Sequence, residues 1–268
     1  MNRVLVTIGP VTVYWYSFLV LVAVLVGYQI VINYAKKMNY HVNAITDMAL
    51  YLVIWSIIGA RLYYVIFHFD LFQDNFIGVF QIWRGGLAIY GGIIGGTLYV
   101  LYYSIRKHLS FIKILDIYSL SLLLGQAIGR WGNFFNQEAY GGETTYEALK
   151  GLFIPDFIIQ GMKIEGVYRQ PTFLYESIWC FIGVIVLYIM RRKITTPLGK
   201  QISFYLCWYG FGRFFIEGLR SDSLYVGMFR ISQIVSLIIF VVGVIGLIYI
   251  KRKNMIRVKD VGGVSGRI

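Results

Sequence analysis

Two polar stretches interrupt otherwise apolar segments of this sequence, and they hold the residues best suited to chemistry. The first, 125–142, reads GQAIGRWGNFFNQEAYGG and carries Arg130 among asparagines, glutamines and glycines. The second, 209–220, reads YGFGRFFIEGLR and places Arg213 and Glu217 four residues apart. A charged side chain near the centre of a membrane helix costs roughly 2.5 to 3.5 kcal/mol on insertion scales, so each is a functional-site hypothesis by default. A guanidinium also offers a planar fork of donors that suits phosphate or carboxylate groups.

These charged residues also have structural interpretations. Arg130 could pair with a carboxylate such as Glu138, and Arg213 with Glu217 could form an ordinary i,i+4 helix pair. Arg61, in the apolar segment GARLYY, could extend its long side chain to the membrane surface. The functional interpretation requires that the polar groups lie at one depth, which depends on the topology.

The composition indicates a protein that crosses a membrane several times. Of its 268 residues, 58% are hydrophobic and only 14% are charged, and the mean hydropathy is +0.66, above the level of soluble domains. Apolar runs near 20 residues are long enough to span the hydrocarbon core. The sequence predicts seven such spans, at 11–34, 47–68, 86–105, 112–132, 173–190, 202–218 and 231–250.

The basic residues follow this topology rather than a nucleic-acid interface. The formal net charge is +12, and most Lys and Arg residues fall in alternate loops, which the positive-inside rule places in the cytoplasm. We therefore expect an all-α membrane protein with its N-terminus outside and its C-terminus cytoplasmic. The predicted organisation is one polytopic membrane domain, 1–250, with a small extracytoplasmic cap of short strands at about 137–170. A basic cytoplasmic tail, 251–268, would follow and lie against anionic lipid.

This topology brings polar residues of five predicted helices to one depth in the outer half of the membrane, given a rise of about 1.5 Å per residue. Those on the sixth span follow a spacing of i, i+4 and i+8 and therefore share one helix face. A cationic pocket at this depth suits a ligand with an anionic head and apolar tails, which is a phospholipid. The residues expected at this level are Tyr16, Arg61, Tyr90, Arg130, Tyr209, Arg213, Glu217 and Arg220.

Other features of the sequence indicate structure rather than chemistry. Glycines at small-xxx-small spacing within 91–96 and at Gly125 and Gly129 predict close helix packing. Cys180 and Cys207 lie in apolar runs and predict small buried thiols without a disulfide. The histidines lack metal-ligand spacing and no serine-hydrolase motif is present, so we expect no metal and no other cofactor.

Six blocks of the sequence carry a family resemblance. The longest is GRWGNFFNQEAYG at 129–141, and the others are VYWYS at 13–17, GARLYY at 59–64, WRGGLAIYGG at 83–92, QPTFLYES at 170–177 and YGFGRFFIEGLRSDSL at 209–224. In this order they resemble the signature blocks of the bacterial prolipoprotein diacylglyceryl transferases. The resemblance extends over nearly the whole chain. The resemblance implies seven spanning helices with an external N-terminus.

The resemblance also implies an activity, the first step of bacterial lipoprotein maturation. In that reaction the diacylglyceryl group of phosphatidylglycerol is transferred to the lipobox cysteine thiol of a preprolipoprotein signal peptide. A thioether forms and glycerol phosphate is released. The implied location is the bacterial cell membrane, with the active site facing the extracytoplasmic leaflet. The implied partners are phosphatidylglycerol, the preprolipoprotein and the lipid bilayer, with no nucleic acid.

Residue roles follow from the resemblance position by position. Arg130 and Arg213 are expected to grip the phosphate and to stabilise the charge that develops on the leaving group. Tyr90 stands where many members have a histidine, and a phenol with a pKa near 10 is a poor base. Either the arginines lower that pKa, or Tyr90 positions substrate while Glu217 or the phosphate assists removal of the thiol proton; we favour the second. The other positions expected to bind substrate are Tyr16, Arg61, Asn133, Glu138, Gly141, Tyr209 and Arg220.

Two other classes of function fit a charged pocket between helices. A lipid transporter or scramblase could pass headgroups through it, although the sequence shows no inverted repeat and no charged path to the cytoplasmic side. A structural or assembly protein would keep its function when Arg130 and Arg213 are replaced by alanine.

Overall fold

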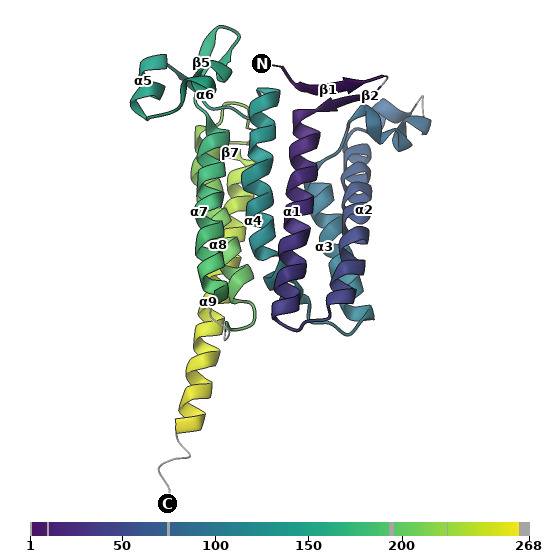
Figure 1. The fold of residues 1–268 in the computed structure, drawn as a ribbon, viewed down its shortest axis with the longest axis vertical. Coiled ribbons are helices and arrows are strands. Elements are labelled where there is room, and N and C mark those ends of the chain that lie inside the picture. The colour runs from purple at the N-terminus through teal and green to yellow at the C-terminus, as the bar shows by residue number, and fades with distance from the viewer. Residues whose placement is uncertain (1, 10, 74–75, 193–195, 224, 263–268) are drawn as a thin grey trace, which may run out of the picture. The chain divides into compact units, whose positions relative to one another are not determined.

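The computed structural model describes residues 2–9, 11–73, 76–192, 196–223 and 225–262, and these are predominantly helical (Figure 1). Within the described residues, five helices are long and apolar enough to cross a membrane, in agreement with the predicted class of helical membrane protein. They are α1 (Trp15–Lys37), α2 (Val42–Phe67), α4 (Phe111–Asn136), α7 (Thr172–Arg192) and the first part of α9 (Ile231–Gly262).

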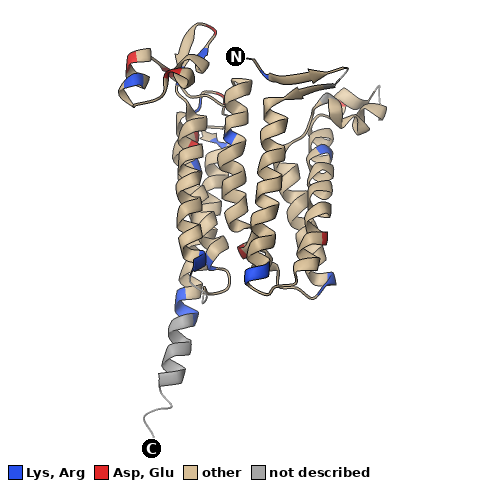
Figure 2. Ribbon diagram, in the orientation of Figure 1, with Lys and Arg blue, Asp and Glu red and all other residues tan. Residues whose placement is uncertain are grey.

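The two remaining predicted spans are also helices, α3 (Ile89–Arg106) and α8 (Lys200–Leu219). Glycines and tyrosines in α3, and charged residues in α8, make them less apolar than the other five. Their crossing of the membrane therefore stays a prediction. Charged residues are sparse along the helices and gather near helix ends (Figure 2).

The chain folds as two compact units. The first contains Met1–Ile30 and Leu115–Ile268, and the second contains Val31–Ile114. In the second unit α2 and α3 pack through glycine, because a Cβ on Gly59, Gly91 or Gly95 would collide with the backbone of the facing helix. The close packing predicted for the glycines of 91–96 is thus confirmed. Three short helices join α2 to α3: η1 (Phe69–Phe72), η2 (Phe76–Phe80) and η3 (Ile82–Arg84).

In the first unit α7, α8 and α9 lie side by side (Figure 1). The α8–α9 contact is again close at glycines, since a Cβ on Gly210 or Gly243 would meet the backbone of the other helix. The packing predicted for Gly125 and Gly129 is wrong, because a Cβ added at either would meet no atom of the described residues within 4 Å. Cys180 and Cys207 are free thiols; Cys180 is buried, as predicted, whereas Cys207 is only partly buried.

The segment predicted to form a cap lies between α4 and α7. It contains three short strands in the order β3-β5-β4, all antiparallel, and two helices of six residues each. Its core packs Leu149, Ile158, Ile159 and Met162 against Phe134 and Phe173 at the ends of α4 and α7. The elements are β3 (Glu143–Thr144), α5 (Tyr146–Gly151), α6 (Asp156–Gly161), β4 (Lys163–Ile164) and β5 (Val167–Arg169).

Two hairpins and the last helix depart from the predicted boundaries. The first predicted span starts at 11, but β-branched residues make Val11–Tyr14 a strand, β2, paired with β1 (Val4–Ile8), and α1 begins only at Trp15. A second hairpin, β6 (Tyr225–Val226) with β7 (Phe229–Arg230), joins α8 to α9. The predicted basic tail continues α9 as helix to Gly262, and residues 263–268 lie outside the described residues.

Candidate active site

A buried carboxylate, Glu176 near the start of α7, holds two arginines from neighbouring helices. Arg130 of α4 donates from Nη2 to its Oε1 at 2.7 Å, and Arg213 of α8 donates from Nη1 to its Oε2 at 2.7 Å. The Glu176 side chain is only 2% exposed, whereas Arg130 is 19% and Arg213 is 11% exposed. Two guanidiniums therefore converge on the two oxygens of one anion.

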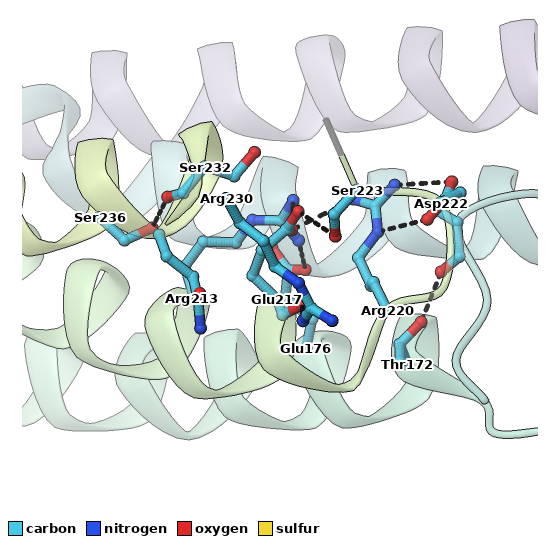
Figure 3. A network of polar contacts seen from close by, with 12 residues as sticks. Thr172, Glu176, Arg213, Glu217, Arg220, Asp222, Ser223, Arg230, Ser232 and Ser236 are labelled. Carbon is cyan, nitrogen blue, oxygen red and sulfur yellow. Dashed lines mark hydrogen bonds and ion pairs between the residues drawn. The ribbon is translucent and has the colours of Figure 1, made fainter. Parts of the chain in front are cut away.

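Glu217 extends this network toward the end of α8 (Figure 3). It pairs with Arg213 one turn earlier and lies 3.5 Å from Nη1 of Arg220. Ser223 donates to Glu217 Oε1 at 2.8 Å, and Arg230 donates to the Glu217 carbonyl oxygen. The i,i+4 pair of the structural interpretation does form, as one part of a network that joins three helices and the following loop.

A second branch of the network runs from Arg130 along the end of α4. Arg130 Nη1 donates to Asn133 Oδ1 at 3.2 Å, and Asn133 Nδ2 donates to Glu138 Oε1 at 2.9 Å. The structural interpretation had Arg130 paired with Glu138, but the partner is Glu176 and Glu138 is reached through Asn133. The residues on either side of Glu138, Gln137 and Ala139, have φ of 52° and 57°, a sparsely populated region that marks a locally strained turn.

A pocket of about 410 Å³ opens beside Glu138. It has a cation, an anion and hydroxyl groups in its lining, so it suits a polar ligand with both donors and acceptors. Tyr16 also packs over Gly132 of α4, where a Cβ would collide with its ring. Two residues predicted to bind substrate, Tyr16 and Glu138, therefore share one cavity. The lining residues are Arg3, Tyr14, Tyr16, Ser17, Asn136, Gln137 and Glu138.

Gly141 and Tyr209 have different surroundings. The amide of Gly141 donates to Gln170 O at 2.9 Å, and a Cβ at Gly141 would collide with Gln170 and with the Leu219 carbonyl oxygen. Gly141 thus permits close backbone approach between the base of the cap and the end of α8. Tyr209 lies one turn before Arg213, within electrostatic reach of Arg130.

The loop after α8 is fixed by a bidentate pair outside the helices. Arg220 donates from Nε and Nη2 to the two carboxylate oxygens of Asp222, each at 2.9 Å. Partial burial acts to raise the pKa of Asp222, but the hydrogen bonds from Arg220 outweigh it and hold the pKa below the ordinary 3.8. Among the described residues, no group of three His, Cys, Asp or Glu side chains could hold a metal ion.

Two predicted site residues, Arg61 and Tyr90, belong to the second unit. Arg61 is 8% exposed, and its guanidinium donates to backbone carbonyls of the α2–α3 connection. Tyr90 is the second residue of α3. Substrate binding by either residue stays a prediction.

The sequence reasoning missed Glu176, the residue at the centre of the network. A usable signal was present, since Glu176 is the one charged residue in the apolar run 173–190, and an intramembrane carboxylate is as costly as an arginine. Arg230 and Ser223 were missed as well. Both lie in the irregular loop region around the second hairpin, where no periodic pattern indicates which side chains turn inward.

Comparisons with known proteins identify the family of this chain. The family model for prolipoprotein diacylglyceryl transferase matches residues 3–249. Proteins named phosphatidylglycerol–prolipoprotein diacylglyceryl transferase are similar along almost their whole length. That of Listeria innocua is 46% identical over 256 residues, covering 95% of this chain and 91% of the relative. That of Halalkalibacterium halodurans is 47% identical over 242 residues, covering 90% and 83%. That of Bacillus mycoides is 46% identical over 253 residues, covering 94% and 93%. The chain belongs to the prolipoprotein diacylglyceryl transferase family and is a transferase.

Proposed function

We propose that the chain transfers the diacylglyceryl group of phosphatidylglycerol to the lipobox cysteine thiol of a preprolipoprotein. A thioether forms and glycerol phosphate is released. The observation that carries this proposal is the convergence of Arg130 and Arg213, each 2.7 Å from a different oxygen of Glu176. That spacing fits two oxygens of a phosphate as well as those of a carboxylate. The names of the relatives support the same substrates.

The two arginines keep donors for a substrate while they hold Glu176. A guanidinium has five N–H groups, and the bonds found for Arg130 use Nη1 and Nη2 once each. Arg213 uses Nη1 for Glu176 and Nη2 for Glu217. A phosphate can therefore bind beside Glu176 or replace it. Because Glu176 is a side chain, it can rotate away without unfolding the helix.

The chemistry then places developing charge where the arginines donate. The thiolate sulfur attacks the glycerol carbon, the carbon–sulfur bond forms, and the carbon–oxygen bond to the phosphate breaks. The electron pair of that bond moves to the phosphate oxygen, and hydrogen bonds from Arg130 and Arg213 stabilise this negative charge. We assign removal of the thiol proton to Glu217 or to the phosphate itself. Tyr16, Asn133, Glu138, Tyr209 and Arg220 are assigned to the polar part of the substrates.

The proposed reaction also sets the orientation of the chain in the bacterial cell membrane. We infer seven spans in one polytopic domain, 1–250, with the N-terminus, the cap and the active site at the extracytoplasmic leaflet and the tail in the cytoplasm. The basic end of α7, Arg191 and Arg192, lies about 24 Å along the helix from Glu176. Basic residues and the Glu176 network thus occupy opposite ends of one helix, which supports this orientation.

Purified protein incubated with phosphatidylglycerol and a lipobox peptide tests the proposal. We expect a peptide whose mass has increased by one diacylglyceryl group through a thioether, with equimolar glycerol phosphate. A peptide with serine in place of the cysteine is the matched control and should remain unmodified. If folded protein moved lipid between leaflets but made no thioether, the transferase assignment would give way to that of a scramblase.

A further inference from the structure

The Arg61 side chain is the main attachment of the α2–α3 connection. Its Nη2 and Nε donate to Gly78 O at 2.7 Å and Val79 O at 2.8 Å, on one side of the loop. Its Nη1 donates to Gly85 O at 2.7 Å and Gly86 O at 2.8 Å, on the other side. One guanidinium therefore joins two separate turns. No carboxylate of the described residues forms an ion pair with it.

The glycines of the WRGG block are required by this arrangement. Gly85 and Gly86 have φ of 88° and 75°, values that L side chains rarely adopt. A Cβ on Gly86 would also collide with Nη1 of Arg61 and with the ring of Tyr64. The positive φ angles of Gly85 and Gly86 turn both carbonyls toward the guanidinium. The WRGG block and Arg61 therefore depend on each other structurally.

The rest of the connection has little core of its own. Phe76, Ile77, Phe80 and Trp83 are between 67% and 77% exposed. Phe72 of η1 is buried, and its ring lies under the guanidinium of Arg61 at 5.2 Å. With so few apolar contacts, the position of this connection depends on the bonds to Arg61.

The backbone just before α3 is also held by α2. The amide of Ala88, the residue before α3, donates to Ala60 O at 3.0 Å, next to Arg61 in α2. Tyr90 follows two residues later and only four residues after Gly86. The backbone just before α3 is therefore held from α2 at two points, Ala88 by Ala60 and Gly85–Gly86 by Arg61, and Tyr90 lies in the first turn that follows.

We propose that Arg61 is a positioning residue, which acts on the reaction by fixing the first turn of α3 and thereby Tyr90, and which does not bind substrate itself. The proposal rests on the proposed function and on the part in it predicted for Tyr90. Backbone carbonyls take four of the five N–H donors of the guanidinium, and a phosphate could take those four only if the loop unfolded. The role proposed for Arg61 thus differs from the substrate binding that the sequence predicted.

A double-mutant cycle tests whether Arg61 acts through Tyr90. Lysine keeps the charge of Arg61 but cannot reach both turns, so Arg61→Lys should lower kcat by about tenfold or more while KM for phosphatidylglycerol changes by less than about twofold. In a Tyr90→Ala background the same change should alter kcat by less than about twofold, because the group being positioned is gone. Equal losses in both backgrounds, or a loss in KM alone, would overturn the proposal.

Arg191→Lys is the matched control, because Arg191 is also buried and donates to two backbone carbonyls, Asp116 O and Ile117 O. It should leave kcat per folded molecule unchanged in both backgrounds. If Arg61→Lys does not fold, Gly86→Ala displaces the same loop with the guanidinium intact and should lower kcat in the same Tyr90-dependent way. Full kcat in Gly86→Ala would contradict the proposal.

Hydrogen exchange separates a failure of this inference from a failure of the proposed function. Arg61→Lys should speed exchange of the amides in 85–92 and leave those in 97–106 unchanged, whether or not the protein makes thioether. Unchanged exchange in 85–92 would show that Arg61 does not fix this turn. Wild-type protein that makes no thioether, with exchange altered as expected, would count against the proposed function alone.

Discussion

Two pairs of arginines in the described helices differ in their partners. Arg130 and Arg213 donate to the carboxylate of Glu176, whereas Arg61 donates to backbone carbonyls and Arg191 to backbone carbonyls and the Gln201 side chain. A carboxylate on a side chain can rotate away and release donors to a ligand. A backbone carbonyl can leave only when a loop or helix end unfolds. We therefore propose that the kind of partner, more than depth or burial, separates arginines available for substrate from arginines that hold the fold.

The largest effect is expected when the carboxylate-held arginines, Arg130 and Arg213, are removed. Arg130→Ala and Arg213→Ala should each lower kcat/KM by about 100- to 1000-fold, the loss typical of one donor aimed at developing charge. Each variant leaves Glu176 one arginine, so both should fold. Thioether formation per membrane-inserted molecule is the measurement. Arg169→Ala, which removes a cap arginine paired with Glu143, is the matched control, and a comparable loss there would contradict the assignment.

The next largest effect is expected at Glu176, whose carboxylate we propose is replaced by the phosphate of the substrate. Glu176→Gln leaves two buried guanidiniums without their shared charge and should lower the free energy of unfolding by about 3 kcal/mol. Saturating phosphatidylglycerol should raise the Tm of this variant more than that of the wild type, because the phosphate supplies the missing anion. Glu147→Gln, at an exposed carboxylate of α5, should change neither quantity. An equal Tm shift in variant and wild type would show that phosphate does not use this site.

The Arg220–Asp222 pair gives a smaller effect that depends on pH. The pKa of Asp222 is lowered in the folded protein, so its stabilising contribution is fully present above the ordinary value of 3.8 and is lost as the pH falls through the folded pKa, below 3.8. After correction for intrinsic rates, hydrogen exchange of residues 220–223 should speed up by about threefold in that acid range. Asp222→Asn should remove this pH dependence, and an unaltered profile would contradict the pairing.

The smallest effect is expected at Tyr90. If Tyr90 positions substrate with its ring, Tyr90→Phe should keep kcat within about threefold of the wild type, since phenylalanine keeps the ring and removes only the hydroxyl. Tyr90→His should be tolerated as well. The measurement is the initial rate of thioether formation at saturating phosphatidylglycerol. An inactive Tyr90→Phe would show that the hydroxyl is essential.

The sequence predicted the parts of the site that follow a regular period. Arg213 and Glu217 share a helix face because their spacing is that of one turn, and Arg130 was conspicuous because charge is costly in an apolar segment. The partner of Arg130 was misjudged, since the choice between Glu138 and Glu176 depends on how α4 and α7 pack. Two of the four backbone carbonyls that bind Arg61 are oriented by the conformation of Gly85 and Gly86. The sequence has no periodic pattern that would predict this conformation.

The fold shows the same division. Long apolar runs correctly indicated the helices. Most of the predicted helix ends lie within a few residues of the observed ends. The packing of Gly125 and Gly129 was wrong because small-residue spacing says which face can pack closely and not whether a partner lies there. The strand at Val11–Tyr14 was read as helix because an apolar run of β-branched residues fits either structure.

The decisive measurement asks whether the carboxylate-held arginines bind the phosphate. It compares single-turnover transfer from phosphatidylglycerol to a lipobox peptide by Arg213→Lys and by Arg191→Lys, at equal amounts of folded protein. Both variants keep their charge and lose the fork. We expect Arg213→Lys to slow transfer by about tenfold or more, while Arg191→Lys lowers the Tm and leaves transfer within about twofold of the wild type. Full transfer by Arg213→Lys, or a larger loss in Arg191→Lys, would contradict the claim that the carboxylate-held arginines grip the phosphate.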